Sequence, residues 1–95
     1  SARVVLEDLQ SLGFAGVRVQ AQRVRLPAGE QPYQETRSVS TDGVLRFTTL
    51  PPGDYAFTAW GGPFRNTLRE ARITLELEPE VRIPLRQDPR DAKPR

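Results

Sequence analysis

Hydrophobic and polar residues alternate with a period of two along most of this 95-residue chain. Successive side chains of an extended strand point to opposite faces, so this period predicts half-buried β-strands. The alternating segments lie near residues 17–26, 44–48, 55–60, 73–77 and 81–85. A short apolar run at residues 3–6 and a polar segment at residues 34–40 are expected to be two further strands. No segment of useful length has a helical period, and residues 7–13 are long enough for one helical turn only. The pattern therefore predicts an all-β protein.

The phase of this alternation changes once within a predicted strand. Val17 and Ala21 share one face, whereas Val24 and Leu26 fall on the other. A β-bulge inserts one residue and restores a common face, so we expect a bulge near residues 22–23.

Two turn signals lie between the predicted strands in the middle of the chain. Asp42 and Gly43 tolerate the positive φ of a tight hairpin. Pro52 fits the second position of a type II turn, and Gly53 fits the third, where φ is positive. We expect both turns to fix the register of the strands they join, and the hydroxyl of Tyr55 to bond back to the second turn.

The polar composition of two segments predicts their places in the fold. Residues 34–40 are polar, as edge strands commonly are, so we expect them at a sheet edge. Pro84 lacks an N–H, so its strand should also lie at an edge or donate no bond at that point. Residues 87–95 contain few apolar groups and are expected to be a tail or linker. The remaining residues, 1–86, are expected to form a single domain.

Seven short strands predict a seven-stranded antiparallel β-sandwich of the transthyretin-like or immunoglobulin-like type. Its core is predicted from the positions that the alternation places on the buried face of each strand. These positions are Val5, Val17, Val19, Ala21, Leu45, Phe47, Leu50, Tyr55, Phe57, Ile73, Leu75, Leu77, Val81, Ile83 and Leu85.

The composition argues against most chemistry. The chain has no Cys and no His, which excludes disulfides, conventional zinc sites and a Ser-His-Asp arrangement within it. The net charge of +2 without a basic block gives no support for nucleic-acid binding, and no apolar run is long enough for membrane insertion. We therefore predict a protein that is not an enzyme and holds no cofactor.

Carboxylates are the remaining candidates for catalysis. Glu76 and Glu78 share the predicted solvent face of a strand, and Pro79 turns the chain before Glu80. A general acid and base need different environments, which a solvated face does not provide. Asp42 and Asp54 stand in turns, where Asp bonds local backbone, and no Asp-rich loop suggests a calcium site.

Several of these motifs resemble the carboxypeptidase regulatory-like domain family, within the wider transthyretin-like (prealbumin-like) and Cna-B-like β-sandwiches. The resemblance rests on Gly16–Val19, on Ser40–Phe47, on Leu50–Phe57 and on the two closing strands. It implies the β-sandwich fold and leaves the function open. Related hydroxyisourate hydrolases use His, which is absent here. Adhesin domains often use a Lys–Asn isopeptide bond, but here the single Lys is Lys93 and the single Asn is Asn66.

Trp60 points away from Tyr55 and Phe57 by parity, and it stands close to Phe64. Exposed aromatic residues mark surfaces that stack on sugars or bind proteins. We therefore take Trp60, Phe64 and Tyr33 as the candidate binding surface. The alternative is that Trp60 packs at the end of the sandwich or under the loop predicted at residues 61–66.

These observations lead to one preferred function and two alternatives. The preferred function is a non-catalytic module of a larger surface-associated or extracytoplasmic bacterial protein, either a spacer or a protein-interaction domain. Its partner would be a neighbouring domain, subunit or other protein, recruited at a strand edge. The alternatives are a carbohydrate-binding module and a subunit of a surface filament or particle. The start at Ser1 suggests a mature or excised piece.

Overall fold

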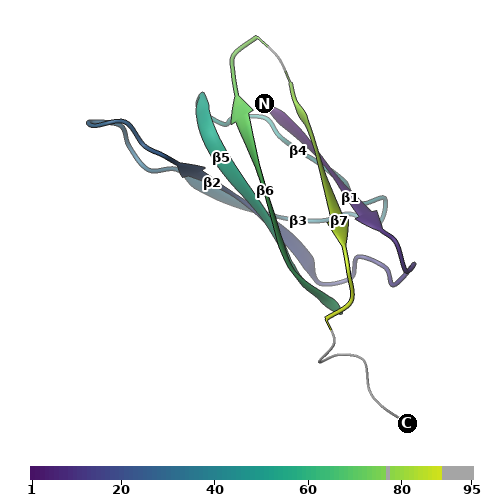
Figure 1. Cartoon of the computed structure of the whole chain (residues 1–95). Coiled ribbons are helices and arrows are strands. Elements are labelled where there is room, and N and C mark those ends of the chain that lie inside the picture. Colours follow the sequence, from purple (N-terminus) through teal and green to yellow (C-terminus); the bar gives the residue numbers. More distant parts are fainter. Residues whose placement is uncertain (77, 89–95) are drawn as a thin grey trace.

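The computed structural model describes residues 1–76 and 78–88, and this part of the chain consists of seven strands and the loops between them (Figure 1). The strands are β1 (Ala2–Asp8), β2 (Val17–Val24), β3 (Gln34–Ser38), β4 (Val44–Phe47), β5 (Gly53–Gly61), β6 (Phe64–Ile73) and β7 (Glu80–Leu85). The prediction of an all-β protein with seven strands is confirmed.

The strands form two sheets whose buried faces meet. One sheet has the order β4-β1-β7 and the other has the order β3-β2-β5-β6. Four of the five strand pairs are antiparallel, but β1 and β7 are parallel. The prediction of a purely antiparallel arrangement is therefore wrong. The chain reaches β7 by crossing from the other sheet, and this crossing brings the last strand alongside the first in the same direction.

The core lies between the sheets and is apolar throughout. Its largest fully buried side chains include Tyr55, Phe47 and Phe57, and Phe47 and Phe57 join the sheets with ring centroids 5.8 Å apart. In β1 the buried side chains are Val4 and its neighbours two positions away, whereas Val5, predicted in the core, is only half-buried. Val4, Val5 and Leu6 are all apolar, so alternation does not show which face of the strand is buried. The sequence therefore could not decide between Val4 and Val5 as the core residue.

The predicted bulge near residues 22–23 is absent. β2 pairs with β5 without interruption as far as Val24, opposite Asp54. Arg23 therefore takes an inward position, and the chain leaves the strand at Arg25, which has a φ of 51°. The irregularity lies instead between β5 and β6, at residues 59–61.

β6 differs most from the prediction. Residues 61–66 were expected to be a loop, but a two-residue turn at residues 62–63 leads directly into β6. The predicted strand at 73–77 is wrong, since β6 ends at Ile73 and Leu75 is 87% exposed. Leu77 lies outside the described residues. β6 lies at the edge of a four-stranded sheet, and the opposite sheet has only three strands and covers little of it. Only its first and last residues are therefore buried, and its sequence shows little alternation.

Both predicted turns connect the two sheets. Gly43 has a φ of 73°, and its N–H donates to the carbonyl oxygen of Ser40 at 3.0 Å, as in a β-turn. However, the strands on either side belong to different sheets, so the turn is not part of a hairpin. The turn after β4 likewise leads to the other sheet. There Gly53 has a φ of 151° and begins β5, which does not fit the predicted type II turn.

One prediction about this second turn is confirmed. The hydroxyl of Tyr55 donates to the carbonyl oxygen of Pro51 at 2.7 Å. The predicted edge positions are also confirmed, because β3 and β7 are outer strands of their sheets. The first residues of the polar segment at 87–95 contact the domain, since the N–H of Asp88 donates to the carbonyl oxygen of Pro63 at 2.8 Å. The rest of that segment lies outside the described residues.

Candidate functional site

Phe64, one of the three predicted surface aromatics, is a core residue. Its side chain is 4% exposed and packs against Phe14, with ring centroids 6.4 Å apart. The short turn before β6 sets this position, because it makes Phe64 the partner of Gly61 across the hairpin. Phe64 therefore offers no stacking surface, and its assignment to a binding surface is corrected here.

The other two aromatics lie at opposite ends of β5. Tyr33 is half-buried, meets Tyr55 edge-on at 6.4 Å and donates its hydroxyl to Glu35 at 3.0 Å. Trp60 is half-buried near the far end of β5, opposite Arg18 of β2. The three predicted residues therefore do not form one surface.

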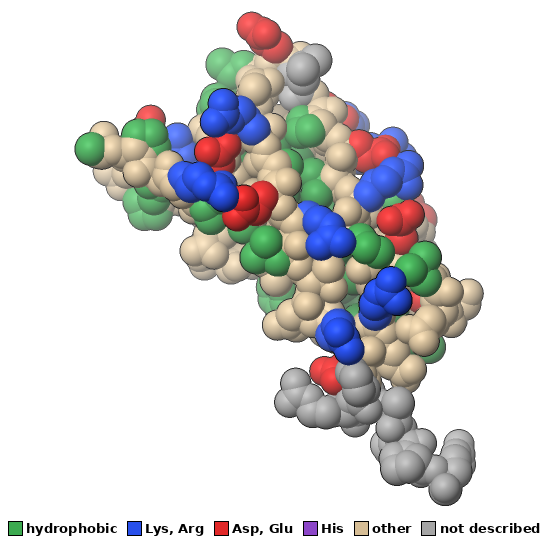
Figure 2. All heavy atoms as spheres, viewed as in Figure 1, with side chains coloured by type: hydrophobic (Ala, Val, Ile, Leu, Met, Phe, Trp, Pro, Cys, Tyr) green, Lys and Arg blue, Asp and Glu red, His purple; other side chains and the backbone are tan. Residues whose placement is uncertain are grey.

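The outer face of the four-stranded sheet is mixed in character. It carries Trp60 and, from β6, Leu68, which pairs with Thr58 and is 50% exposed. Arg72 and Asp54, which pair across β5 and β6, add an ion pair at 3.0 Å. Basic and acidic side chains are likewise interspersed over the side of the molecule that Figure 2 shows. Such a face combines isolated apolar groups with charges of both signs, which is ordinary for the surface of a folded protein.

The predicted turn residues have structural roles. Asp42 accepts hydrogen bonds from the hydroxyl of Ser40 at 2.7 Å and from the N–H of Val44 at 3.1 Å. The Ser40 bond, followed by the Val44 bond, holds the pKa of Asp42 below its ordinary value. Gly43 lies against Phe14, where an added Cβ would come within 2.7 Å of the ring. Both residues fix local backbone.

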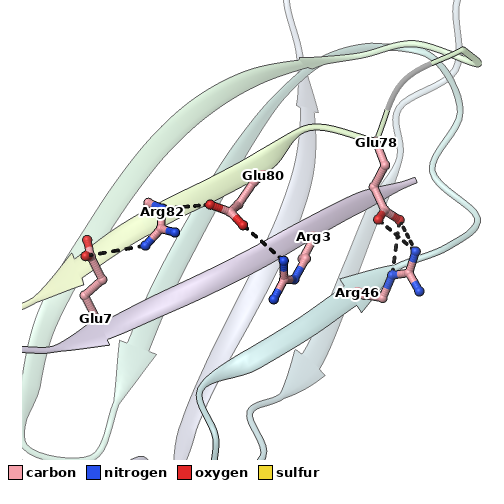
Figure 3. A network of polar contacts seen from close by, with 6 residues as sticks. All are labelled: Arg3, Glu7, Arg46, Glu78, Glu80 and Arg82. Atoms are coloured by element: carbon pink, nitrogen blue, oxygen red, sulfur yellow. Dashed lines mark hydrogen bonds and ion pairs between the residues drawn. The ribbon is translucent and has the colours of Figure 1, made fainter.

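Charged side chains cover the outer face of the other sheet (Figure 3). Arg3 and Arg46 lie directly opposite each other on β1 and β4, and like charges in this position repel. Two carboxylates offset the repulsion. Arg46 binds Glu78 through two nitrogens, with its shortest distance 2.7 Å, and Arg3 binds Glu80 at 3.2 Å.

Glu78 is suited to hold charge and not to transfer protons. Its hydrogen bond from Arg46 lowers its pKa, and a further bond from the Ser1 hydroxyl at 3.0 Å acts in the same direction against desolvation. A carboxylate whose pKa is lowered stays ionised near neutral pH and is a poor general acid. Glu78 is exposed, as expected for a solvated position, but it lies between β6 and β7 and not on the predicted strand at 73–77.

The parallel pair of β1 and β7 is the most distinctive feature of the structure. Its register runs from Arg3 opposite Glu80 to Asp8 opposite Leu85. Arg82 extends the charged ladder, since it lies 2.7 Å from Glu80 on its own strand and 3.8 Å from Glu7 on β1. The first and last strands of the domain are thus joined through both backbone and side chains.

The backbone directions along this pair follow from two hydrogen bonds. The N–H of Arg3 donates to the carbonyl oxygen of Pro79 at 3.0 Å, whereas that of Leu6 donates across the other edge of β1 to Gly43 at 2.8 Å. Alternation along a strand therefore directs Val5 and Glu7 toward β7, as it does Arg3. On β7 the same alternation turns the nitrogen of Pro84, which lacks a hydrogen, away from β1.

The two ends of this pair have different neighbours. At the start of β1, Ser1 lies beside Glu78. At the end of β7, the carbonyl oxygen of Arg86 accepts from the N–H of Arg65 at 3.0 Å, and the N–H of Gln87 donates to the side chain of Gln10 at 2.9 Å. The described chain thus enters at one end of the sheet and leaves at the other.

Sequence reasoning missed two side chains that organise loops. The Asp8 carboxylate accepts from the N–H of Leu12 at 2.9 Å and from that of Gly13 at 2.6 Å, which holds the loop after β1. An Asp before a Gly-containing loop is a signal that could have found it. Arg23 occupies an inward position, is 11% exposed at its side chain and binds Glu30 at 3.2 Å. Arg23 lies on the same face of β2 as the buried Ala21, but a charged residue is not expected on a buried face, so the sequence did not indicate this position.

Two surface pockets flank the ends of the sandwich. One, of about 360 Å³, includes Arg23 and Tyr33 in its lining. The other, of about 340 Å³, includes Phe14 and Val39. The Arg23 guanidinium in the first pocket is already bound by Glu30, and the second pocket has no charged lining residue. Neither pocket combines a free charged group with an apolar lining.

Comparisons with known proteins return no match: no family model, no curated protein and no solved structure matches the chain. Over residues 1–76 and 78–88, no group of three or more His, Cys, Asp and Glu side chains is arranged to hold a metal ion. The same residues include no helix that is long and apolar enough to cross a membrane.

Proposed function

We propose that this chain is a structural spacer module that sets the distance and direction between its neighbours in a larger protein. The observation that carries the proposal is the parallel register of β1 and β7 from Arg3–Glu80 to Asp8–Leu85. Because parallel strands run the same way, a preceding segment attaches at one end of the sheet and a following segment at the other.

The separation between these ends depends on strand length. A strand rises about 3.3 Å per residue, so the five steps between the six paired positions separate entry from exit by about 17 Å. The pairing also makes this separation rigid, because the two strands cannot slide without breaking their ladder. A rigid domain with separated entry and exit points is what a spacer requires.

The family resemblance and the charge pattern support the same proposal. From the resemblance of Gly16–Val19 and Leu50–Phe57 to carboxypeptidase regulatory-like domains, we propose that this chain is of that transthyretin-like type and is a module of a larger surface or extracytoplasmic protein. The ion pairs of Arg3, Arg46 and Arg82 keep the outer face of the smaller sheet charged and solvated. Such a face favours a domain that stays separate from its neighbours.

The alternatives have less support. A carbohydrate platform needs several exposed aromatics, but burial of Phe64 leaves Trp60 without its proposed neighbour. Strand addition at β3 is opposed by the ion pair of Arg37 and Glu35, which alternation places on the inward side of the edge, with the Arg37 guanidinium 5.8 Å from the ring centre of Phe47. Inward-pointing charges protect edges from pairing.

Small-angle X-ray scattering from two copies of the full chain fused in tandem tests the spacer proposal. An in-line arrangement gives a maximum dimension close to twice that of the single chain. A pair that folds back side by side, with a maximum dimension near that of one copy, would contradict it. Light scattering from the single chain serves as the control, since a spacer stays monomeric and a filament subunit assembles.

A further inference from the structure

We propose that the β1/β7 pair is a mechanical clamp, which lets this module carry tension between its two ends. The proposal rests on the spacer function, because a spacer transmits any pull that acts on its neighbours. It adds a load-bearing role that depends on the direction of the pull.

The geometry of the load follows from the topology. A pull on the two ends of the chain draws β1 toward its own start and β7 toward its own end. Since the strands are parallel neighbours, the pull acts along their common direction and shears the pair (Figure 1). Shear loads every hydrogen bond of the ladder together, whereas a pull across the strands loads the bonds one after another. Forced unfolding is governed by the unfolding barrier, which is higher in the first case.

The ladder is continuous where the load acts. Arg3, Val5 and Glu7 direct their backbone groups toward β7, and the nitrogen of Pro84 faces away from β1. The proline therefore removes no bond from the clamp. The N–H that proline lacks would point to the side of β7 opposite β1. A proline at this position is therefore compatible with a β1/β7 ladder that carries load.

The core side of the clamp is closed to water. Val4 and Leu6 on β1 lie beneath it together with Val81 and Ile83 on β7, and each of these side chains is 5% exposed or less. Water replaces stretched backbone bonds most readily where it has access to them. Burial on one face limits that access, and hydrogen bonds are stronger in such surroundings.

The charged ladder on the outer face responds to the same displacement. Glu7 lies opposite Pro84, two positions beyond Arg82, and the two charged groups are 3.8 Å apart at rest. Movement of β1 toward its start carries Glu7 toward the level of Arg82. This ion pair therefore persists through the first displacement, while the directly opposed pair of Arg3 and Glu80 lengthens.

Single-molecule force spectroscopy on the full chain tests the clamp through two pulling geometries. The chain has no Cys, so paired Cys substitutions provide unique handles. Handles at Ser1 and Arg95 load the clamp in shear. Handles at Ser1 and Glu76 lie just before β1 and just before β7, at the same end of the pair. A pull between them separates the two strands from that end and breaks the ladder one pair at a time. We expect a rupture force several-fold higher for the first pair of handles, and equal forces would overturn the proposal.

A matched pair of variants separates the clamp from general stability. Arg82→Ala removes the ion pairs to Glu7 and Glu80, whereas Arg72→Ala removes the pair to Asp54 in the other sheet. Chemical denaturation should give similar, small losses for both variants. Only Arg82→Ala should lower the rupture force in shear. An equal reduction by Arg72→Ala would also overturn the proposal.

These results can be told apart from a failure of the spacer proposal. Equal rupture forces combined with an in-line tandem would reject the clamp and leave the spacer intact. A high shear force combined with a folded-back tandem would reject the spacer and leave the mechanical property of the fold intact.

Discussion

The hydroxyl of Tyr55 donates to the carbonyl oxygen of Pro51, four residues earlier in the chain, at 2.7 Å. This bond ties the start of β5 to the segment that crosses from one sheet to the other. The ring itself is fully buried, and burial is the main cause of the raised pKa of Tyr55. A polar group in such surroundings needs its partner.

Tyr55→Phe removes this bond and leaves the ring in place. We expect the free energy of unfolding to fall by about 1 kcal/mol, because the Pro51 carbonyl loses its donor. Tyr33→Phe is the matched control, since Tyr33 is only half-buried whereas Tyr55 is fully buried, and it should cost about 0.5 kcal/mol or less. Urea denaturation measures both. Equal losses would mean that the Pro51 bond has no special role.

Gly43→Ala tests the contact between the crossing turn and Phe14. Gly43 and Gly29 both have positive φ, but an added Cβ meets the Phe14 ring at 2.7 Å in the first case and nothing within 4 Å in the second. Gly29→Ala should therefore cost about 1 kcal/mol from backbone strain alone, and Gly43→Ala should cost more. In a Phe14→Ala background the excess should shrink but not vanish, because the added Cβ would still lie 3.2 Å from the carbonyl oxygen of Leu6, and a double-mutant cycle measures the Phe14 part.

Phe64→Ala distinguishes a core residue from a binding residue. Truncation of a buried Phe costs about 3–5 kcal/mol, so this variant should be severely destabilised. Trp60→Ala removes a half-buried ring and should cost clearly less. Thermal and urea unfolding of the two variants provide the measurement. A Phe64→Ala protein that unfolds like its parent would mean that the side chain is exposed.

Acid should weaken the loop after β1. Desolvation raises the pKa of Asp8, but the backbone hydrogen bonds from Leu12 and Gly13 outweigh it, and the net pKa lies below 3.8. A lowered folded-state pKa contributes stability that is present above the unfolded value and is lost as the pH falls through the folded value.

Asp8→Asn should therefore be less stable than the parent above about pH 4, and the gap should close at lower pH. Denaturation series at several pH values measure the gap. Glu76→Gln, a change in an exposed loop, is the control and should shift the curve little at any pH. A gap for Asp8→Asn that is constant with pH would exclude the carboxylate as its cause.

The sequence predicts the central strands well because their burial is one-sided. In β2 apolar and polar residues alternate cleanly, so the pattern alone identifies Val17, Val19 and Ala21 as core. In β5 the two aromatic residues Tyr55 and Phe57 mark the buried face, although Ala56 between them is also buried. The Tyr55 bond was predictable for a related reason: a Tyr placed shortly after a turn can reach back to it.

The remaining features depend on contacts distant in sequence. β6 is held by its register with β5 and not by its own pattern, so the alternation at 73–77 was misleading. Arg23 takes an inward place because β2 continues in register, which no local signal reveals. The choice between Val4 and Val5 likewise requires β4 and β7. The predicted aromatic surface is wrong because the sequence did not reveal the turn at residues 62–63. Without that turn, the alternation of β5 gives no information about which way Phe64 points.

The central position of β1 also constrains how the chain acquires its fold. Both partners of β1 come later in the sequence, and the contact of Arg3 with Glu80 closes a loop of 77 residues. Closing so long a loop is entropically costly before the contacts reward it, so assembly of this sheet is expected to be a late event. On a ribosome, Val4 and Leu6 would stay without β7 until nearly the whole domain had been made. The strand made first is thus among the last to be secured.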